Sequence, residues 1–207
     1  MDSSDFSREF NRLAQQEIIM ERINEYIHVF SFPFHDLLLN YKDIIIEEFK
    51  EVQLPTYNDN ASANFPSNFK GMEDVNGFFP NYIHHIVDKF YLTDKIYPIQ
   101  PNFGLYVQDG DKSINVFHNH LFTPNVGSMV ATFYLDPPKE GEGGELEFML
   151  HEATKFQIPV EKDKIYFFPN WLLHTPKPQN NKDYRICFNY TIQGSRKPLN
   201  TKTGDIW

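Results

Sequence analysis

The segment YRICFNYTI, residues 184–192, alternates between two kinds of side chain. Its even-numbered positions are apolar or aromatic, whereas the odd-numbered positions from Arg185 onward are polar or small. Successive side chains of a strand point to opposite faces, so this pattern predicts a strand with one face packed in a core. The other face, which carries Arg185 and Asn189, is expected to meet either solvent or a cavity that holds a ligand.

The same two-residue period runs through most of the chain after about Pro98. Turn-forming clusters such as QDGDKS, DPPKEGEGG and KPQNNKD separate the alternating segments. The expected strands are residues 103–108, 113–118, 128–135, 144–150, 156–160, 164–168 and 184–192. Many short strands at roughly even spacing indicate a sandwich or barrel of the jelly-roll kind.

Before Pro98 the spacing of apolar residues is close to that of a helix. Helices are expected over residues 5–27, 36–52 and 79–92, the last with Pro80 in its first turn. The segment VFSFPF between the first two is expected to be a short strand or extended turn. The polar, turn-prone residues 53–77 are either a lid over a site or an ordinary surface excursion.

These patterns together predict a mainly β fold with flanking helices (α+β). Residues 1–97 would form a helical N-terminal part with the lid candidate at 53–77. Residues 98–207 would form the β core, and the two parts would pack as one domain. The N-terminal helices could serve a homodimer interface as readily as a substrate surface.

Composition and charge exclude several classes of protein. The 207 residues contain one cysteine, Cys187, so no intramolecular disulfide can form. The N-terminus lacks the features of a secretory signal, and no apolar run approaches the roughly 20 residues that span a bilayer. We therefore expect a soluble cytoplasmic protein without a membrane partner. The formal net charge of −9 argues against nucleic acid as a partner, because phosphate backbones are bound by clustered Lys and Arg.

Three histidines are the candidates for a metal site. His118 and His120 stand one residue apart in VFHNH, so they would project to the same side of an extended strand. His174 follows in FFPNWLLHTPKP, at the end of an aromatic strand and before Pro176. A histidine next to backbone that proline restrains is well placed to be a rigid ligand.

The order of these pieces resembles the 2-oxoglutarate/Fe(II)-dependent oxygenases, and within them a small group related to the prolyl 4-hydroxylases. The matching pieces are FHNH, GSMVATFYLDPP, GGELEF, IYFFPNWLLH and YRICFNYTI. They lie between Leu105 and Ile192 and cover less than half of the chain.

The resemblance implies a double-stranded β-helix, which is a distorted jelly roll, with Fe(II) held by three protein ligands. It further implies 2-oxoglutarate and O2 as cosubstrates, with oxidative decarboxylation of 2-oxoglutarate coupled to hydroxylation of a small molecule or a protein side chain. The implied metal ligands are His118, His120 and His174. Arg185 would bind the far carboxylate of 2-oxoglutarate, and Tyr106 and Asn189 would add further contacts with the cosubstrate.

The chain departs from the wider family at the third ligand position, where His-x-Asp or His-x-Glu is usual and His120 stands here. Three arrangements are open. His120 is a third imidazole ligand, which is the arrangement we expect; a carboxylate from elsewhere reaches in; or the position is left to water. The carboxylates nearest the motif in sequence are Asp136, Glu145 and Glu147.

Two other functions compete with an oxygenase. A cupin-like metal-binding jelly roll also places a His-x-His pair on a strand, but it would have a Glu shortly after the pair and a Pro-x-Gly before the last histidine. Here LFTPN follows the pair and PNWLLH precedes the last histidine. The other alternative is a non-catalytic binding protein whose histidines only pack.

Overall fold

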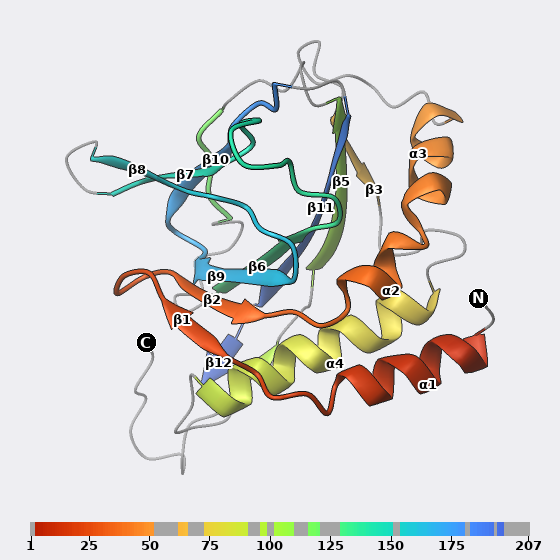
Figure 1. The fold of residues 1–207 in the computed structure, drawn as a ribbon. Helices are drawn as coiled ribbons and strands as arrows, with labels where there is room; N and C mark the ends of the chain where they lie inside the picture. The colour runs from red at the N-terminus through yellow and green to blue at the C-terminus, as the bar shows by residue number, and fades with distance from the viewer. Residues whose placement is uncertain are drawn as a thin grey trace.

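The computed structural model describes residues 3–51, 62–65, 73–90, 96–98, 102–109, 116–120, 129–150, 154–180, 183–192 and 194–196. These residues form antiparallel sheets with helices on one side, as Figure 1 shows. The strands are β1 (Met20–Arg22), β2 (His28–Ser31), β3 (Ser62–Phe65), β4 (Ile96–Pro98), β5 (Asn102–Asp109), β6 (Met129–Tyr134), β7 (Leu146–Met149), β8 (Lys155–Ile158), β9 (Lys164–Pro169), β10 (Leu173–Pro176), β11 (Tyr184–Ile192) and β12 (Gly194–Arg196). The helices are α1 (Ser3–Leu13), α2 (His35–Leu39), α3 (Lys42–Glu51) and α4 (Glu73–Phe90).

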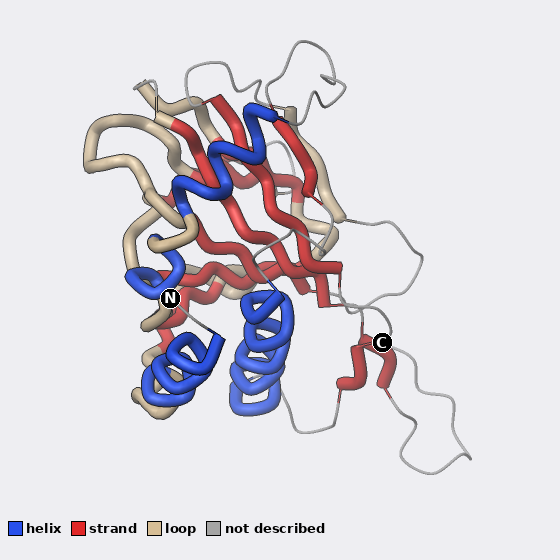
Figure 2. The backbone as a smooth tube through the Cα atoms, turned by 90° about the vertical axis from the view of Figure 1, so that its right-hand side faces the viewer, coloured by secondary structure: helices blue, strands red, loops and turns tan. Residues whose placement is uncertain are grey.

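A seven-stranded sheet, in the order β1-β2-β9-β6-β11-β5-β3, is the centre of the fold. The smaller sheet β10-β7-β8 packs over one face of it, and β12 pairs with β4 in a separate ribbon. On the other face, α1 and α4 lie side by side, as Figures 1 and 2 both show. Strand β11 pairs with β5 on one side and with β6 on the other, so it is held from both edges.

Alternation along the central strands divides their side chains between two cores. In β6, Ala131 and Phe133 face the helices, whereas Val130 and Tyr134 face the small sheet. Strand β9 follows the same rule. The even-numbered residues of β11 from Ile186 onward also join the helix-side core. Its polar face therefore points into the space between the two sheets, as the register with β6 requires.

This polar face is buried. Only 3% of Arg185, 9% of Asn189 and 3% of Thr191 is exposed. Solvent therefore does not account for the polar positions of YRICFNYTI. These polar side chains are instead buried between the two sheets, which is the environment that the other expectation, a ligand-holding interior, requires.

Most expected strands agree with the structure to within one or two residues. The expected strand 113–118 is an exception, because residues 110–115 lie outside the described residues and residues 116–120 form only one isolated bridge, His118↔His174. Of the lid candidate, residues 53–61 and 66–72 also lie outside the described residues, and residues 73–77 belong to α4. Residues 62–65 form β3, which pairs with β5.

The expected helix over residues 5–27 is wrong beyond Leu13. Met20–Arg22 forms strand β1 instead, paired with β2, and the Ile19 N–H donates to the Ser31 hydroxyl. Ile19 and Ile23 are spaced like residues on one face of a helix, but both are exposed. Their spacing therefore does not mark a helix face that packs on a core.

The other two expected helices differ at their ends. The expected helix 36–52 is two helices, because the Asn40 amide donates to the carbonyls of Asp36 and Leu37 and ends α2. Helix α4 begins at Glu73, so Pro80 lies inside the helix and not in its first turn. Among the described residues, no helix is long and apolar enough to cross a membrane.

Strands that precede residue 98 share the large sheet with strands that follow it. Strands β1, β2 and β3 all belong to it, and α1 and α4 pack on it. The division of the chain at residue 98 stays a prediction.

Aromatic stacking on the helix side of the sheet should contribute much of the stability. Phe133 is buried and its ring lies 4.3 Å from that of Phe32 and 4.7 Å from that of Phe188, measured between centroids. We expect Phe133→Ala to lower the free energy of unfolding by about 3–5 kcal/mol. Ile44→Ala, on an exposed position of α3, should cost less than about 1 kcal/mol. Urea unfolding measures both, and a loss below about 1 kcal/mol for Phe133→Ala would contradict this packing.

Candidate metal centre

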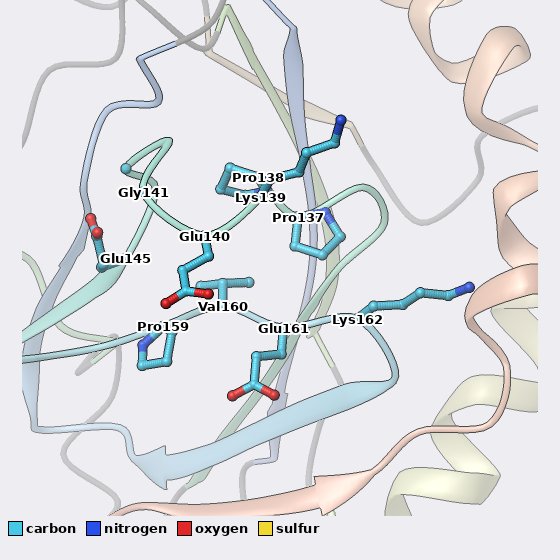
Figure 3. A pocket seen from close by; sticks show the side chains of 11 residues that line it. Pro137, Pro138, Lys139, Glu140, Gly141, Glu145, Pro159, Val160, Glu161 and Lys162 are labelled. Carbon is cyan, nitrogen blue, oxygen red and sulfur yellow. The ribbon is translucent and has the colours of Figure 1, made fainter.

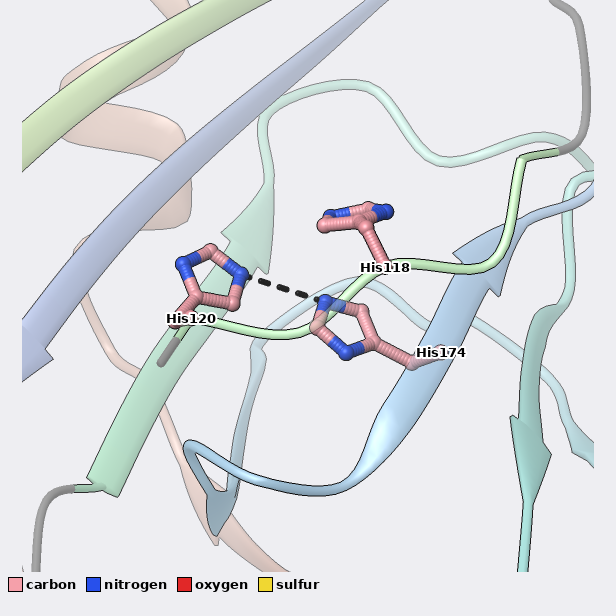
Figure 4. Close-up of side chains that lie close together, drawn as sticks. All are labelled: His118, His120 and His174. Atoms are coloured by element: carbon pink, nitrogen blue, oxygen red, sulfur yellow. Dashed lines mark hydrogen bonds between the residues drawn. The ribbon is translucent and has the colours of Figure 1, made fainter. Parts of the chain in front are cut away.

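Backbone pairing brings the three histidines together. The segment 116–120 runs beside β10, and His118 and His174 exchange two backbone hydrogen bonds of 3.0 Å. The His120 N–H donates to the Asn170 carbonyl at 2.8 Å, which fixes the other end of the segment against the turn before β10. Figure 4 shows the three rings facing one another. One ring nitrogen from each lies within 4.8 Å of the others, a spacing at which all three could bind one metal ion.

Backbone carbonyls fix the orientation of two of these rings. The Nδ1 of His174 lies 2.9 Å from the Leu172 carbonyl, and the Nδ1 of His118 lies 3.1 Å from the Val116 carbonyl. A carbonyl oxygen only accepts, so each Nδ1 carries the hydrogen and each Nε2 keeps its lone pair. Such a hydrogen bond is the usual support of a metal-binding histidine.

The third ring can take either tautomer. The Nε2 of His120 lies 3.3 Å from the Nε2 of His174, and its Nδ1 lies 3.4 Å from the Thr191 hydroxyl. With no cation between the rings, His120 donates from Nε2 to His174. A hydroxyl both donates and accepts, so the Thr191 hydroxyl can accept a hydrogen bond from Nδ1–H in the tautomer that leaves the Nε2 lone pair free to bind a metal.

The cluster is buried on one side and open on the other. His120 and His174 are buried, and the His174 ring packs 4.6 Å from the Phe168 ring, whereas His118 is exposed. Burial, reinforced by the nearby His118 ring, lowers the pKa of His120 to about 4 and that of His174 to about 3. Both rings are therefore neutral at pH 7, as ligation requires.

The carboxylates considered as substitutes for His120 are engaged elsewhere. Asp136 pairs with Lys42, and Glu147 accepts from the Gln157 amide at 2.8 Å. Glu145 lines a separate hollow. Among the residues that the structure describes, no carboxylate joins the three histidines. The geometry therefore supports the arrangement with three imidazoles.

Arg185 is a buried cation at the other end of the polar face. Its guanidinium donates to the carbonyls of Lys177 (2.5 Å) and Gly144 (3.0 Å), and it lies 4.6 Å from the centroid of the Tyr134 ring. No carboxylate within the described ranges lies at ion-pair distance from it. A buried cation held only by carbonyls and an aromatic face is costly, so this position suits an anionic ligand.

A strip of neutral polar side chains joins Arg185 to the histidines. On β11 it comprises Cys187, Asn189 and Thr191, the last in contact with His120. On β6 it comprises Thr132, whose hydroxyl lies 3.0 Å from the Cys187 thiol, and Tyr134. Burial raises the pKa of both Tyr134 and Cys187, so both stay protonated at neutral pH. We call these residues, with Arg185, the polar strip.

The structure thus brings most of the predicted site residues to one region. His118, His120 and His174 form the cluster, and Arg185 and Asn189 lie on the polar strip. Tyr106 lies on β5 directly opposite Cys187, but its side chain is outside the described part of the chain. Sequence reasoning missed Tyr134. The alternation of residues 128–135 carried the signal, because it places Tyr134 on the face opposite Phe133.

A separate hollow of about 620 Å³ lies between the β6–β7 and β8–β9 connections, as Figure 3 shows. Pro138, Pro159 and Val160 are among the apolar residues that line it, and Glu140 and Glu161 are among the charged ones. None of the three histidines lines it. It adjoins the glycine turn whose Gly144 carbonyl receives Arg185.

Comparison with known proteins identifies the fold. No protein-family model and no curated protein sequence matches the chain. Among solved structures, a prolyl 4-hydroxylase from Pseudomonas putida is 11% identical over 91% of this chain and 98% of its own, with a TM-score of 0.58. SnoK, a non-heme α-ketoglutarate-dependent carbocyclase of nogalamycin biosynthesis, is 12% identical over 100% of this chain and 95% of its own, with a TM-score of 0.60.

HygX from Streptomyces hygroscopicus, solved with nickel and 2-oxoglutarate bound, is similar over 80% of this chain and 81% of its own, at 10% identity and a TM-score of 0.56. At such identities the likeness concerns the fold alone. The chain has the double-stranded β-helix, the jelly-roll fold of these oxygenase structures, and the fold class predicted from its sequence is confirmed.

Proposed function

We propose that the chain is an Fe(II)- and 2-oxoglutarate-dependent dioxygenase, which couples oxidative decarboxylation of 2-oxoglutarate to hydroxylation of a substrate. One observation carries the proposal: a cluster of three histidines is joined by one polar strip to a buried arginine, which has no carboxylate partner among the described residues. A metal site alone would not require the arginine. A dicarboxylate that reaches from the metal to the arginine accounts for both.

The three histidines fit the metal. His118 and His174 present Nε2 lone pairs, because backbone carbonyls orient their rings. His120 can present its own Nε2 lone pair in the tautomer whose Nδ1–H donates to the Thr191 hydroxyl. When bound, iron would supply the activation of O2 that side chains cannot provide. The protein contributes three ligands on one side and leaves positions for cosubstrates on the other, next to the exposed His118.

Arg185 and its neighbours fit the far end of the cosubstrate. A guanidinium binds a carboxylate through charge-assisted hydrogen bonds, and its burial strengthens the attraction. The protonated Tyr134 hydroxyl would donate to the same carboxylate, and the Asn189 amide lies on the same strip. Tyr106 stays a further candidate. A cupin-like metal site assigns no role to Arg185, and a binding protein whose histidines only pack assigns none to the histidine cluster. The presence of both favours the oxygenase.

Hydroxylation is the proposed reaction outcome, and its acceptor is a small molecule or a protein side chain. The similar structures include a prolyl hydroxylase and a carbocyclase, so one fold hosts different outcomes. The position of the substrate near the metal decides among them.

An anaerobic absorption titration tests the proposal. Purified metal-free protein is titrated with Fe(II) and then with 2-oxoglutarate, beside His174→Ala, Arg185→Gln and the surface control Arg8→Gln. We expect a visible charge-transfer band that needs both additions and is absent in His174→Ala. Loss of the charge-assisted bonds, worth about 1.5–3 kcal/mol each, should raise the half-saturating 2-oxoglutarate concentration at least about tenfold in Arg185→Gln.

Arg8 is exposed on α1, so its variant should titrate like the wild type. On admission of O2, the complex should release succinate. Protein that binds the metal but shows neither the band nor succinate would contradict the proposal.

The glycine turn gives a matched pair of variants. Gly144 and Gly141 both have positive φ, +81° and +84°, so alanine should cost about 1–2 kcal/mol of stability at either. Only at Gly144 would the new Cβ meet Pro138, 2.5 Å from its Cγ, and displace the carbonyl that receives Arg185. We expect Gly144→Ala to weaken 2-oxoglutarate binding several-fold and Gly141→Ala to leave it unchanged. Equal 2-oxoglutarate affinities, measured by the same titration, would show that this turn does not position Arg185.

A further inference from the structure

Among the described residues, the site between the two sheets carries only positive formal charge. All three candidate ligands are imidazoles, which bind a metal without supplying a negative charge, and among the described residues no carboxylate joins them. The polar strip is neutral apart from Arg185, because Tyr134 and Cys187 stay protonated. The described part of the site therefore contains a permanent cation and no anion.

A divalent metal bound here keeps its full charge. Three imidazoles neutralise none of it, and Arg185 adds a further positive charge along the same strip. Like charges in a buried site repel each other strongly, so the repulsion from Arg185 weakens the binding of the metal when the cosubstrate is absent. The dianion 2-oxoglutarate would bring one carboxylate to the metal and the other to Arg185, so it would offset one charge of the metal and the charge of the arginine. By linkage, the factor by which 2-oxoglutarate tightens metal binding equals the factor by which the metal tightens 2-oxoglutarate binding.

We infer that His120 makes metal retention depend on the dicarboxylate cosubstrate, so that the protein holds its metal firmly only as a ternary complex. This inference rests on the proposed function. A carboxylate at position 120 would remove one charge of the metal before the cosubstrate arrives. It would raise the affinity for the metal in the absence of 2-oxoglutarate. It would therefore reduce the factor by which 2-oxoglutarate tightens metal binding.

Substitutions at position 120 separate the effect of the charge of the side chain from the effect of its shape. His120 is held by its backbone N–H to the Asn170 carbonyl, a contact that any side chain preserves. Asp and Asn have nearly the same shape and differ by one charge. The pair His120→Asp and His120→Asn therefore isolates the effect of a negative ligand.

The experiment measures Co(II) affinity by competition with a fluorescent chelator, with and without saturating 2-oxoglutarate, in wild type, His120→Asp and His120→Asn. We expect 2-oxoglutarate to tighten Co(II) binding about thirtyfold or more in wild type and in His120→Asn, but less than about tenfold in His120→Asp. Without 2-oxoglutarate, His120→Asp should bind Co(II) at least about tenfold more tightly than His120→Asn. Circular dichroism establishes that both variants are folded.

The two proposals fail in different ways. If 2-oxoglutarate tightens Co(II) binding by the same factor in His120→Asp and His120→Asn, the inference about His120 is wrong and the oxygenase proposal stands. If 2-oxoglutarate has no effect on Co(II) binding in wild type, both are wrong.

A measurement on the wild type alone keeps the inference testable if the variants do not fold. The monoanion 2-oxopentanoate has the same five-carbon chain as 2-oxoglutarate, with a methyl group in place of the far carboxylate. At saturation it should tighten Co(II) binding at least about tenfold less than 2-oxoglutarate does. Equal factors for the two ligands would overturn the charge account.

Discussion

The fold of this chain depends on β11, the strand whose alternation separates an aromatic core from a polar interior. Its apolar face joins β6, β9, α1 and α4 in the helix-side core, and pairing with β5 and β6 holds both of its edges. A shift of one residue would bury Arg185 among phenylalanines and bring Phe188 to the polar side, so the register is strongly specified. Two carbonyls and the Tyr134 ring offset only part of the cost of burying Arg185.

The candidate site follows from this arrangement. The smaller sheet covers the polar face of β11, and its edge strand β10 carries His174. The segment 116–120 is then joined to β10 by backbone hydrogen bonds, which places His118 and His120 beside His174. Each ring is restrained by its own environment: two by backbone carbonyls, and His120 by Thr191 of β11. The same strand thus touches the histidine cluster at one end and carries Arg185 at the other.

Where burial dictated the side-chain pattern, the sequence was informative. The strands with strict alternation, above all residues 184–192, were predicted closely. The structure also brings the three histidines together and places Arg185 on a polar face, and their roles stay predictions. The helix expected over 5–27 failed because Ile19 and Ile23 kept a helical spacing without being buried, and strand pairing with β2 is a distant contact that spacing does not show. Tyr134 was missed for a similar reason: its place beside Arg185 depends on the register of β6 with β11.

The account predicts one metal ion held by three imidazoles and no carboxylate of the chain. Crystals grown with Ni(II) and 2-oxoglutarate, measured at the nickel absorption edge, locate the ion directly. A single anomalous peak about 2.1 Å from the Nε2 atoms of His118, His120 and His174 would support it, with the far carboxylate of 2-oxoglutarate against Arg185. A metal bound by only two of the histidines together with a carboxylate of the chain, with His120 still turned toward Thr191, would contradict it.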